Sequence, residues 1–445
     1  HDWQTGMIPV LLSVQYAHLP EFSGIKTVMT IHNLQYQGVF GIKEVQDVLG
    51  LGDSLFTNDK IECYGAANFL KAGIVYSDEV TTVSPSYAEE IQTAYYGERL
   101  DGLLRAKKEH LTGVLNGIDI KIYDPANDNN IAAKYSVEDM SGKDTCKRAL
   151  LLQVRPEVPI IGMVGRLSNQ KGLDLVDYVI ADIMREDVQL VCLGMGDSRY
   201  VNLFSWAEQN YPGRVAARFV MDHALAHQIY AGCDIFLMPS QFEPCGLSQM
   251  IAMRYGTVPV VRETGGLRDT VLSFNEYTGA GNGFTFFNYN AHDMLYTIQR
   301  ALHYYWNKKD IWSMLRQRGM EGDFSWTHSA EMYMSIYQNL LNPPKEAEEK
   351  KPVRKAAAAR TAAVKTEKAP AKKAPAKAAA KAETAEKPAA RKPAAKKPAA
   401  KAEAEAKPVA KKPAVKKTTA KAETEAKPAV KKPAARKPAA KKTEE

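Results

Sequence analysis

Gly165-Arg-Leu-Ser-Asn-Gln-Lys-Gly172 directly follows a short apolar run, Val158-Pro-Ile-Ile-Gly-Met-Val164, and this pairing is the strongest indication of how the chain folds. A second segment, Phe242-Glu-Pro-Cys-Gly-Leu-Ser-Gln249, follows the apolar run Asp234-Ile-Phe-Leu-Met-Pro239. Short apolar runs of this kind are typical of buried strands in parallel sheets, and ligands bind in the loops beyond the carboxyl ends of such strands. We therefore interpret both segments as loops of one binding site.

The charged side chains of these loops suit a nucleotide-sugar ligand. Arg166 and Lys171 are five residues apart across a turn into a predicted helix, so both cations can face one diphosphate without a metal ion. Glu243 lies beside a proline in the second loop, where a carboxylate can accept sugar hydroxyls or stabilise positive charge at an anomeric carbon. An arginine and a lysine near a helix start are by themselves more often a solvated face. Because both loops occur in this order, we favour a ligand site over a solvated face.

The charge of the chain divides sharply near Leu341. Residues 343–445 contain 31 lysine and arginine residues against 12 glutamates, a net charge of +19, whereas residues 1–342 contain 28 basic and 39 acidic residues. The tail has no aromatic residue and holds 13 of the 23 prolines. It therefore cannot bury enough apolar surface to offset the entropy of ordering, and we predict that it is disordered.

Repeats in this tail indicate low complexity rather than a solenoid. Units of 20 residues begin at Lys381, Lys401 and Lys421, but they have no hydrophobic faces to stack. Their Lys-Pro-Ala-Ala-Lys pattern resembles linker-histone tails, which favours salt-dependent binding to nucleic acid or another polyanion. The tail lacks aromatic residues for base stacking, and a solvated spacer is an equally good interpretation.

Residues 1–342 are enough for about two domains. The chain has five cysteines, an odd number without Cys-x-x-Cys spacing, which predicts a reducing, cytoplasmic location and argues against disulfides or a zinc site. No apolar run approaches the length of about 18 residues that a membrane helix needs, and no signal-peptide pattern is present. We therefore predict no membrane span.

Apolar runs alternate with helical patterns along residues 1–342, as a doubly wound parallel sheet requires. The first block has predicted strands at 26–31, 79–83 and 114–115, and Ser84-Pro-Ser86 with Glu89 predicts a helix start. The second block has predicted strands at 160–164, 189–193, 218–220, 235–238, 258–261 and 283–287. A Pro- and Asn-rich stretch at 124–130 and a helical pattern over 137–152 connect the blocks.

Seven segments in register resemble one family. They are His1-Asp-Trp3, Thr30-Ile-His-Asn-Leu34 with Tyr36-Gln-Gly38, Thr81-Thr-Val-Ser-Pro85, Leu115-Asn-Gly-Ile-Asp119, Gly165 to Leu175, Phe242 to Gln249, and Thr264-Gly-Gly-Leu-Arg-Asp-Thr-Val271. In this order they are similar to bacterial glycogen synthases, the ADP-glucose glucosyltransferases related to plant starch synthases. The resemblance extends from residue 1 to about residue 341. It implies the α/β architecture called GT-B, in which two Rossmann-like domains face each other across a cleft.

The resemblance also implies how the chain is divided. An incomplete first Rossmann-like domain, on the acceptor side, spans residues 1–123, and a second, nucleotide-sugar-binding domain with its linker spans 124–320. A closing helix over 321–342 returns to the first domain, and the basic tail over 343–445 follows it. The family carries a Lys-x-Gly-Gly-Leu phosphate-binding loop near its start, and this chain begins at His1 without one. We therefore expect a fragment that is inactive without that loop.

Roles in catalysis follow from the resemblance in the same way. Arg166 and Lys171 would bind the donor diphosphate and stabilise the departing ADP. Glu243 would lie beside the transferred glucose. His1 and Asn116 would contact the same glucosyl unit from the facing domain.

Further motif positions would contact the nucleotide or the acceptor. Backbone N–H groups at a helix N-terminus would meet the phosphate, where glycines allow close approach, at Thr264, Gly265 and Gly266. The nucleotide itself would contact Ser248 and Met221, the latter at a place where the family usually has an aromatic ring stacked on adenine. The cleft near the acceptor would be lined by His32, Tyr36 and Gln37.

The reaction implied is transfer of glucose from ADP-glucose to the 4-hydroxyl of an α-1,4-glucan (glycogen), with retention at the anomeric carbon and without a cofactor. Retention without an enzymic nucleophile indicates a front-face, oxocarbenium-like step from which domain closure excludes water. Two alternatives stay open: a related retaining glycosyltransferase with another nucleotide-sugar donor, and a noncatalytic polyanion-binding protein led by the tail. The intact Arg166, Lys171 and Glu243 count against the second.

Overall fold

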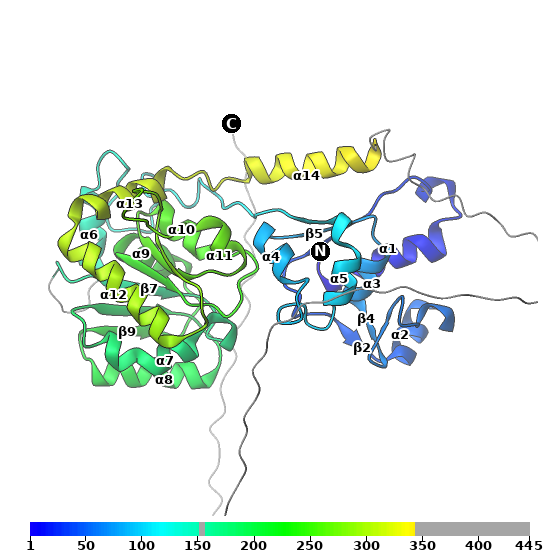
Figure 1. Ribbon diagram of the computed structural model, residues 1–445, viewed down its shortest axis with the longest axis horizontal. Helices are drawn as coiled ribbons and strands as arrows, with labels where there is room; N and C mark the ends of the chain where they lie inside the picture. Colours follow the sequence, from blue (N-terminus) through cyan, green and yellow to red (C-terminus); the bar gives the residue numbers. More distant parts are fainter. Residues whose placement is uncertain (151–155, 343–445) are drawn as a thin grey trace, which may run out of the picture. The chain divides into compact units, whose positions relative to one another are not determined.

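The first half of the chain carries one parallel sheet and one small antiparallel sheet (Figure 1). The computed structural model describes residues 1–150 and 156–342. The parallel sheet has the order β1-β5-β6, formed by Val28–Ile31, Glu79–Thr82 and Leu111–Gly113. The antiparallel sheet has the order β2-β4-β3, formed by Val39–Phe40, Ala66–Asn68 and Glu62–Cys63. Loops that leave the carboxyl ends of β1, β5 and β6 therefore emerge at one edge of the parallel sheet.

Five helices accompany these sheets. They are α1 at Met7–Leu11, α2 at Ile42–Leu49, α3 at Phe69–Tyr76, α4 at Pro85–Glu90 and α5 at Asp101–Ala106. The start of α4 has the predicted form, because Ser84 accepts a hydrogen bond from the backbone N–H of Tyr87 and Pro85 occupies the first helical position. A buried cluster that includes Met29, Ile31 and Leu70 joins this sheet to its helices.

The second sheet is parallel throughout and has six strands. In spatial order they run β12-β11-β10-β7-β8-β9, formed by Phe284–Phe286, Val258–Arg262, Ile235–Met238, Ile160–Val164, Gln189–Leu193 and Val215–Arg218. The chain starts in the middle at β7, builds outward through β8 and β9, and then crosses to β10 to build the other side. The strand order therefore reverses between β7 and β10, and ligands of doubly wound sheets bind at such a reversal.

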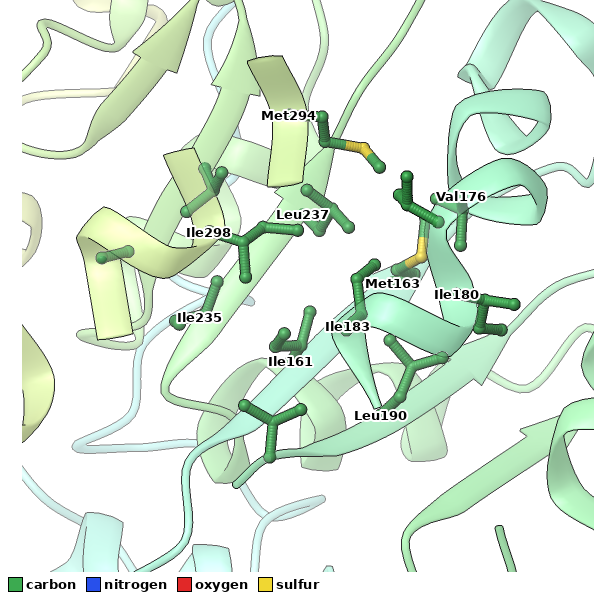
Figure 2. Close-up of a cluster of buried hydrophobic side chains, with 14 of the residues drawn as sticks. Ile161, Met163, Val176, Ile180, Ile183, Leu190, Ile235, Leu237, Met294 and Ile298 are labelled. Carbon is green, nitrogen blue, oxygen red and sulfur yellow. The ribbon is translucent and has the colours of Figure 1, made fainter. Parts of the chain in front are cut away.

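Helices cover both faces of this sheet (Figure 1). They are α6 at Ser141–Ala149, α7 at Leu173–Ile183, α8 at Ser198–Asn210, α9 at His223–Gly232, α10 at Ser248–Arg254, α11 at Gly265–Thr270, α12 at Ala291–Asn307 and α13 at Lys309–Glu321. The last helix, α14 at Trp326–Leu341, lies instead by the first sheet, where Ser329 donates to the carbonyl of Leu115 and Tyr333 hydrogen-bonds Thr81. Figure 2 shows one core layer, in which side chains of α7 and α12 meet those of the central strands. Ile161, Leu190 and Ile235 are fully shielded from solvent there, which explains the continuous apolar runs in the sequence.

Most of the predicted strands of the second sheet are confirmed, and one is displaced. Residues 160–164, 189–193 and 235–238 have the predicted bounds, but β9 spans Val215–Arg218 instead of 218–220. The apolar run that suggested a strand at 218–220 continues past the strand end, where Val220 is 48% exposed and Met221 is 81% exposed. In the first sheet, β6 ends at Gly113, so the strand predicted at 114–115 lies three residues earlier in the structure.

Two further predictions concern helices and the tail. The helical pattern over 137–152 forms a shorter helix, α6, in the described residues. The prediction of disorder for residues 343–445 lies outside the residues that the structure describes. Among those it does describe, no helix is long and apolar enough to cross a membrane.

Candidate nucleotide-sugar site

The two charged loops of the sequence lie next to each other at the point where the strand order reverses. The backbone N–H of Gln241 donates to the carbonyl of Gln170 over 2.9 Å, and the Gln170 side chain donates to the carbonyl of Phe242 over 3.3 Å. Gly172, with a φ of +68°, allows this contact, because a Cβ there would lie 1.9 Å from the Pro239 carbonyl oxygen. The loops after β7 and β10 therefore form one surface.

Lys171 and Glu243 form an ion pair across these loops. The Nζ of Lys171 lies 2.7 Å from Oε2 of Glu243, and the hydroxyl of Ser240 donates to the same oxygen over 2.9 Å. Glu243 is only 6% exposed, whereas the side chain of Lys171 is 24% exposed and faces the outside of the pair. The carboxylate is thus fixed and neutralised by a cation that an incoming anion can also reach.

Arg166 lies in the same loop as Lys171 but is exposed. Its guanidinium donates to the Tyr36 hydroxyl over 3.3 Å and approaches the Gln170 side-chain oxygen at 3.5 Å. These are long contacts to neutral groups, and no carboxylate pairs with Arg166 among the described residues. Arg166 therefore keeps most of its hydrogen-bonding capacity for an anion. The contact also joins Tyr36, in the first half of the chain, to the charged loop of the second half.

A cavity of about 280 Å³ opens beside Arg166, beyond the carboxyl ends of β7, β8 and β9. One wall is the exposed apolar pair Val220 and Met221. The lining also has aromatic and imidazole rings, contributed by Tyr123, His227 and Tyr230. Flat apolar walls next to a free cation suit a nucleotide base whose phosphates point toward Arg166.

The rings of this wall were not identified from the sequence, and a buried carboxylate holds them. Asp128 is 5% exposed and accepts hydrogen bonds from the Tyr255 hydroxyl, over 2.6 Å, and from Nδ1 of His227, over 2.7 Å. The ring of Tyr123 stacks on His227 with a centroid separation of 5.0 Å. Burial alone would raise the pKa of Asp128, but these hydrogen bonds together hold that pKa below its usual value.

His1 and His32 meet at the edge of the first sheet. Nδ1 of His1 lies 2.9 Å from Nε2 of His32, and the carboxylate of Asp2 accepts the backbone N–H of His32 over 2.7 Å. The predicted acceptor-side residues therefore include one pair in direct contact. Gln37 has a structural contact instead, because its amide accepts from Asn68 over 2.6 Å and donates to the Glu98 carbonyl over 2.9 Å.

The segment at Thr264–Gly266 already has partners in the structure. The Thr264 hydroxyl and the Gly265 N–H donate to the carboxylate of Glu90 over 3.1 and 3.0 Å. The Gly266 N–H donates to the backbone carbonyls of Glu243 and Pro244. A carboxylate therefore occupies the place where we predicted a phosphate contact. Burial raises the pKa of Glu90, while the contacts at Gly265 and Thr264 lower it.

The remaining predicted residues lie on the edges of the site. The backbone N–H of Asn116 is directed at the sulfur of Cys245, within the loop that carries Glu243. Burial raises the pKa of that thiol to about 12, which leaves it inert. Ser248 begins α10 and accepts a hydrogen bond from the Tyr230 hydroxyl over 3.2 Å. Among the described residues, no group of three His, Cys, Asp or Glu side chains is arranged to hold a metal ion.

Comparison with known proteins relates this geometry to a family. Residues 1–106 match the family model described as the starch synthase catalytic domain, and residues 152–313 match the model described as glycosyl transferases group 1. The glycogen synthase of Geobacillus thermodenitrificans is 55% identical over 345 residues, which are 77% of this chain and 71% of that protein. The glycogen synthase of Clostridium novyi is 50% identical over 346 residues, with 77% and 72% covered.

A solved structure gives the same result at the level of the fold. The catalytic domain of starch synthase IV from Arabidopsis thaliana, bound to ADP and acarbose, aligns with a TM-score of 0.72 and 35% identity. The alignment covers 77% of this chain and 72% of that chain. This likeness confirms the predicted α/β fold of GT-B type.

Proposed function

Because this chain belongs to the family of glycogen synthases and starch synthases, we propose that it transfers glucose from ADP-glucose to the non-reducing end of an α-1,4-glucan, with retention at the anomeric carbon. The chain is a hexosyltransferase by its family. The observation that supports the proposed donor and stereochemistry is the ion pair of Lys171 and Glu243, in which Nζ lies 2.7 Å from Oε2.

Arg166 and Lys171 both interact with the negative charge of the donor diphosphate. Arg166 lines the nucleotide cavity and has free donors, so it binds the diphosphate bidentately. Lys171 holds Glu243 in the ligand-free state and turns its exposed side to the diphosphate when the donor is bound. Both cations then stabilise the negative charge that collects on departing ADP, which lowers the barrier to breaking the bond between the sugar and phosphate.

Glu243 stabilises the opposite charge. Its carboxylate is buried and fixed by Ser240, so it keeps its position while positive charge develops on the glucosyl ring. The acceptor 4-hydroxyl approaches from the face that ADP leaves. Its oxygen forms the new bond to the anomeric carbon, and its proton goes to the oxygen of the departing phosphate, so the configuration is retained.

The first half of the chain supplies the acceptor side. His1 and Asn116 contact the transferred glucose, and Tyr36, His32 and Gln37 lie along the glucan. The hydrogen bond between Arg166 and the Tyr36 hydroxyl supports this assignment, since it brings the acceptor side to within one side chain of the diphosphate position. Ser248 and Met221 contact the nucleoside in the cavity, and the segment at Thr264–Gly266 receives phosphate once Glu90 releases it.

The test is incorporation of labelled glucose into glycogen, measured for a gene product that carries the Lys-x-Gly-Gly-Leu loop and for the present chain beside it. ADP-glucose and UDP-glucose are supplied separately, because a preference for UDP-glucose would assign another donor. Arg166→Gln is expected to abolish measurable incorporation, whereas Arg185→Gln, at a side chain that is 77% exposed in the turn after α7, is the matched control. Incorporation that survives Arg166→Gln would refute the assignment of the diphosphate site.

Two further expectations are part of this proposal. A cytoplasmic location is supported by the five cysteines, which are all free thiols. Salt-dependent binding of nucleic acid or another polyanion by residues 343–445 is supported by their net charge of +19. Retention on DNA at low salt, lost when the tail is removed, is the measurement that tests it.

A further inference from the structure

A second cavity lies at the amino end of the six-stranded sheet, away from the nucleotide site. Its walls come from α6, from the segments that lead into β7 and β10, and from the junction of α12 with α13. Asp234, in this wall, directly precedes β10, whereas Glu243 of the nucleotide site follows the same strand. The volume is about 520 Å³, within the range of small-molecule sites.

Four cationic side chains line this cavity, and only one of them has a carboxylate partner in the described chain. Lys147 pairs with Asp234 over 2.8 Å and donates to the Tyr305 hydroxyl over 2.9 Å. Arg148, Lys309 and Arg316 line the cavity without an ion pair among residues 1–150 and 156–342. Two more carboxylates, those of Asp144 and Glu157, belong to the lining. Positive charge therefore remains in excess at the wall.

The start of α13 adds a second contribution to the positive potential of the cavity. Lys309 is the first residue of this 13-residue helix and lines the cavity, and no side chain caps the helix at Lys308. The first-turn N–H groups therefore have no side-chain partner, and the helix dipole places partial positive charge beside the cationic residues. Asp310 in that turn offsets part of this charge, but it does not line the cavity. Phosphate groups bind at helix starts of this kind.

We propose that this cavity binds a small phosphorylated ligand, either free phosphate or a hexose phosphate. Arg316, Lys309 and Arg148 take the phosphate oxygens. The volume exceeds what phosphate alone needs, so the cavity also has room for a sugar. The site is separate from the one proposed for ADP-glucose, and the inference stands independently of that function.

The experiment is calorimetric titration of the whole chain with glucose 1-phosphate, with inorganic phosphate and with glucose, in saturating ADP. The ADP occupies the nucleotide site, so the remaining heat belongs to other sites. Binding of a phosphorylated ligand, with none of glucose, is expected. The double variant Lys309→Gln/Arg316→Gln should weaken it about tenfold or more, because two charge-assisted hydrogen bonds are lost. A lower Kd for glucose 1-phosphate than for phosphate would identify the hexose phosphate as the ligand.

A matched control removes the same charge elsewhere. Lys43→Gln/Arg185→Gln replaces two exposed cations, of which the side chains are 78% and 77% exposed, and keeps the basic tail. Equal weakening in both double variants would show nonspecific attraction and overturn the proposal, as would absence of binding or binding unchanged by Lys309→Gln/Arg316→Gln. If Lys309→Gln/Arg316→Gln does not fold, Arg148→Gln is used in its place, because Arg148 is exposed. Binding unchanged by Arg148→Gln would then overturn the proposal. The Kd for ADP should be the same in each variant as in the wild type, which would show that the nucleotide site is intact.

Discussion

Replacing Glu243 by glutamine is expected to separate nucleotide binding from glucosyl transfer. Glutamine keeps the shape of the side chain and one oxygen for the Ser240 hydroxyl, which lies 2.9 Å from Oε2. The charge disappears, however, and Lys171, 2.7 Å away, loses its partner. A diphosphate then meets a cation that it need not share with a carboxylate.

The magnitude follows from the geometry of the pair. Two unit charges at the 2.7 Å separation of this pair interact by about 6 kcal/mol at an effective dielectric constant of 20, which is an upper limit because water also screens them. The exposed part of Lys171 is screened by water, so we expect ADP to bind about tenfold more tightly, or about 1.4 kcal/mol. Transfer should fall by about 10²- to 10³-fold, as when one preorganised electrostatic group is lost.

Calorimetry with ADP and incorporation of labelled glucose, both measured on the gene product that carries the Lys-x-Gly-Gly-Leu loop, report the two effects in the same preparation. Glu79→Gln is the matched control, because Glu79 also has a charge partner, Nδ1 of His110 at 2.9 Å, but lies at the amino end of β5, away from the site. Weaker ADP binding by Glu243→Gln would refute the competition for Lys171. Transfer near the wild-type rate would refute the role of Glu243 in stabilising the glucosyl cation.

Three other changes test the nucleotide cavity. Tyr255→Phe removes a hydrogen bond to the buried carboxylate of Asp128, so the free energy of unfolding should fall by about 1.5–3 kcal/mol in urea titrations; an unchanged midpoint would contradict this. The pKa of Asp128 is held low, so its contribution to stability is present above the unfolded pKa of about 3.9 and is lost as pH falls through the folded value. Thermal melts of Asp128→Asn should therefore depend less on pH in the acid range than those of wild type. Met221→Tyr, at a position 81% exposed in the cavity wall, should strengthen ADP binding by about 0.5–1.5 kcal/mol through ring stacking, and weaker binding in calorimetry would show that the base lies elsewhere.

The sequence predicted the second sheet well because its strands are buried on both faces. The runs at 160–164 and 235–238 are apolar without interruption, which leaves little doubt about their structure. The strand predicted at 218–220 was wrong because Phe219 and Val220 are apolar but lie after the end of β9. Val220 and Met221 line a cavity instead of a core, and a hydrophobic pattern alone does not distinguish the two.

The candidate site was only partly visible in the sequence. Arg166, Lys171 and Glu243 belong to local motifs, and charged residues next to glycine and proline after a strand are recognisable. The contact of Asp128 with His227 joins residues 99 positions apart, and neither has a neighbour that would reveal its role. Glu90 is a helical glutamate in the sequence, and only the folded chain brings it to Thr264. Such pairings depend on tertiary structure, which spacing along the chain does not encode.

The two halves of the chain are joined by two connections that lie against each other. The chain crosses between the two parallel sheets twice, and the crossings are hydrogen-bonded to each other, with the N–H of Ile118 donating to the carbonyl of Phe324 over 2.8 Å. They are also tightly packed, because a Cβ on Gly117 would lie 2.5 Å from the backbone nitrogen of Trp326. A movement of one half must therefore bend both crossings together. Asn116 lies within the first crossing, and its backbone N–H is directed at Cys245 in the loop that holds Glu243, so we expect Asn116 to stay with that loop when one half moves.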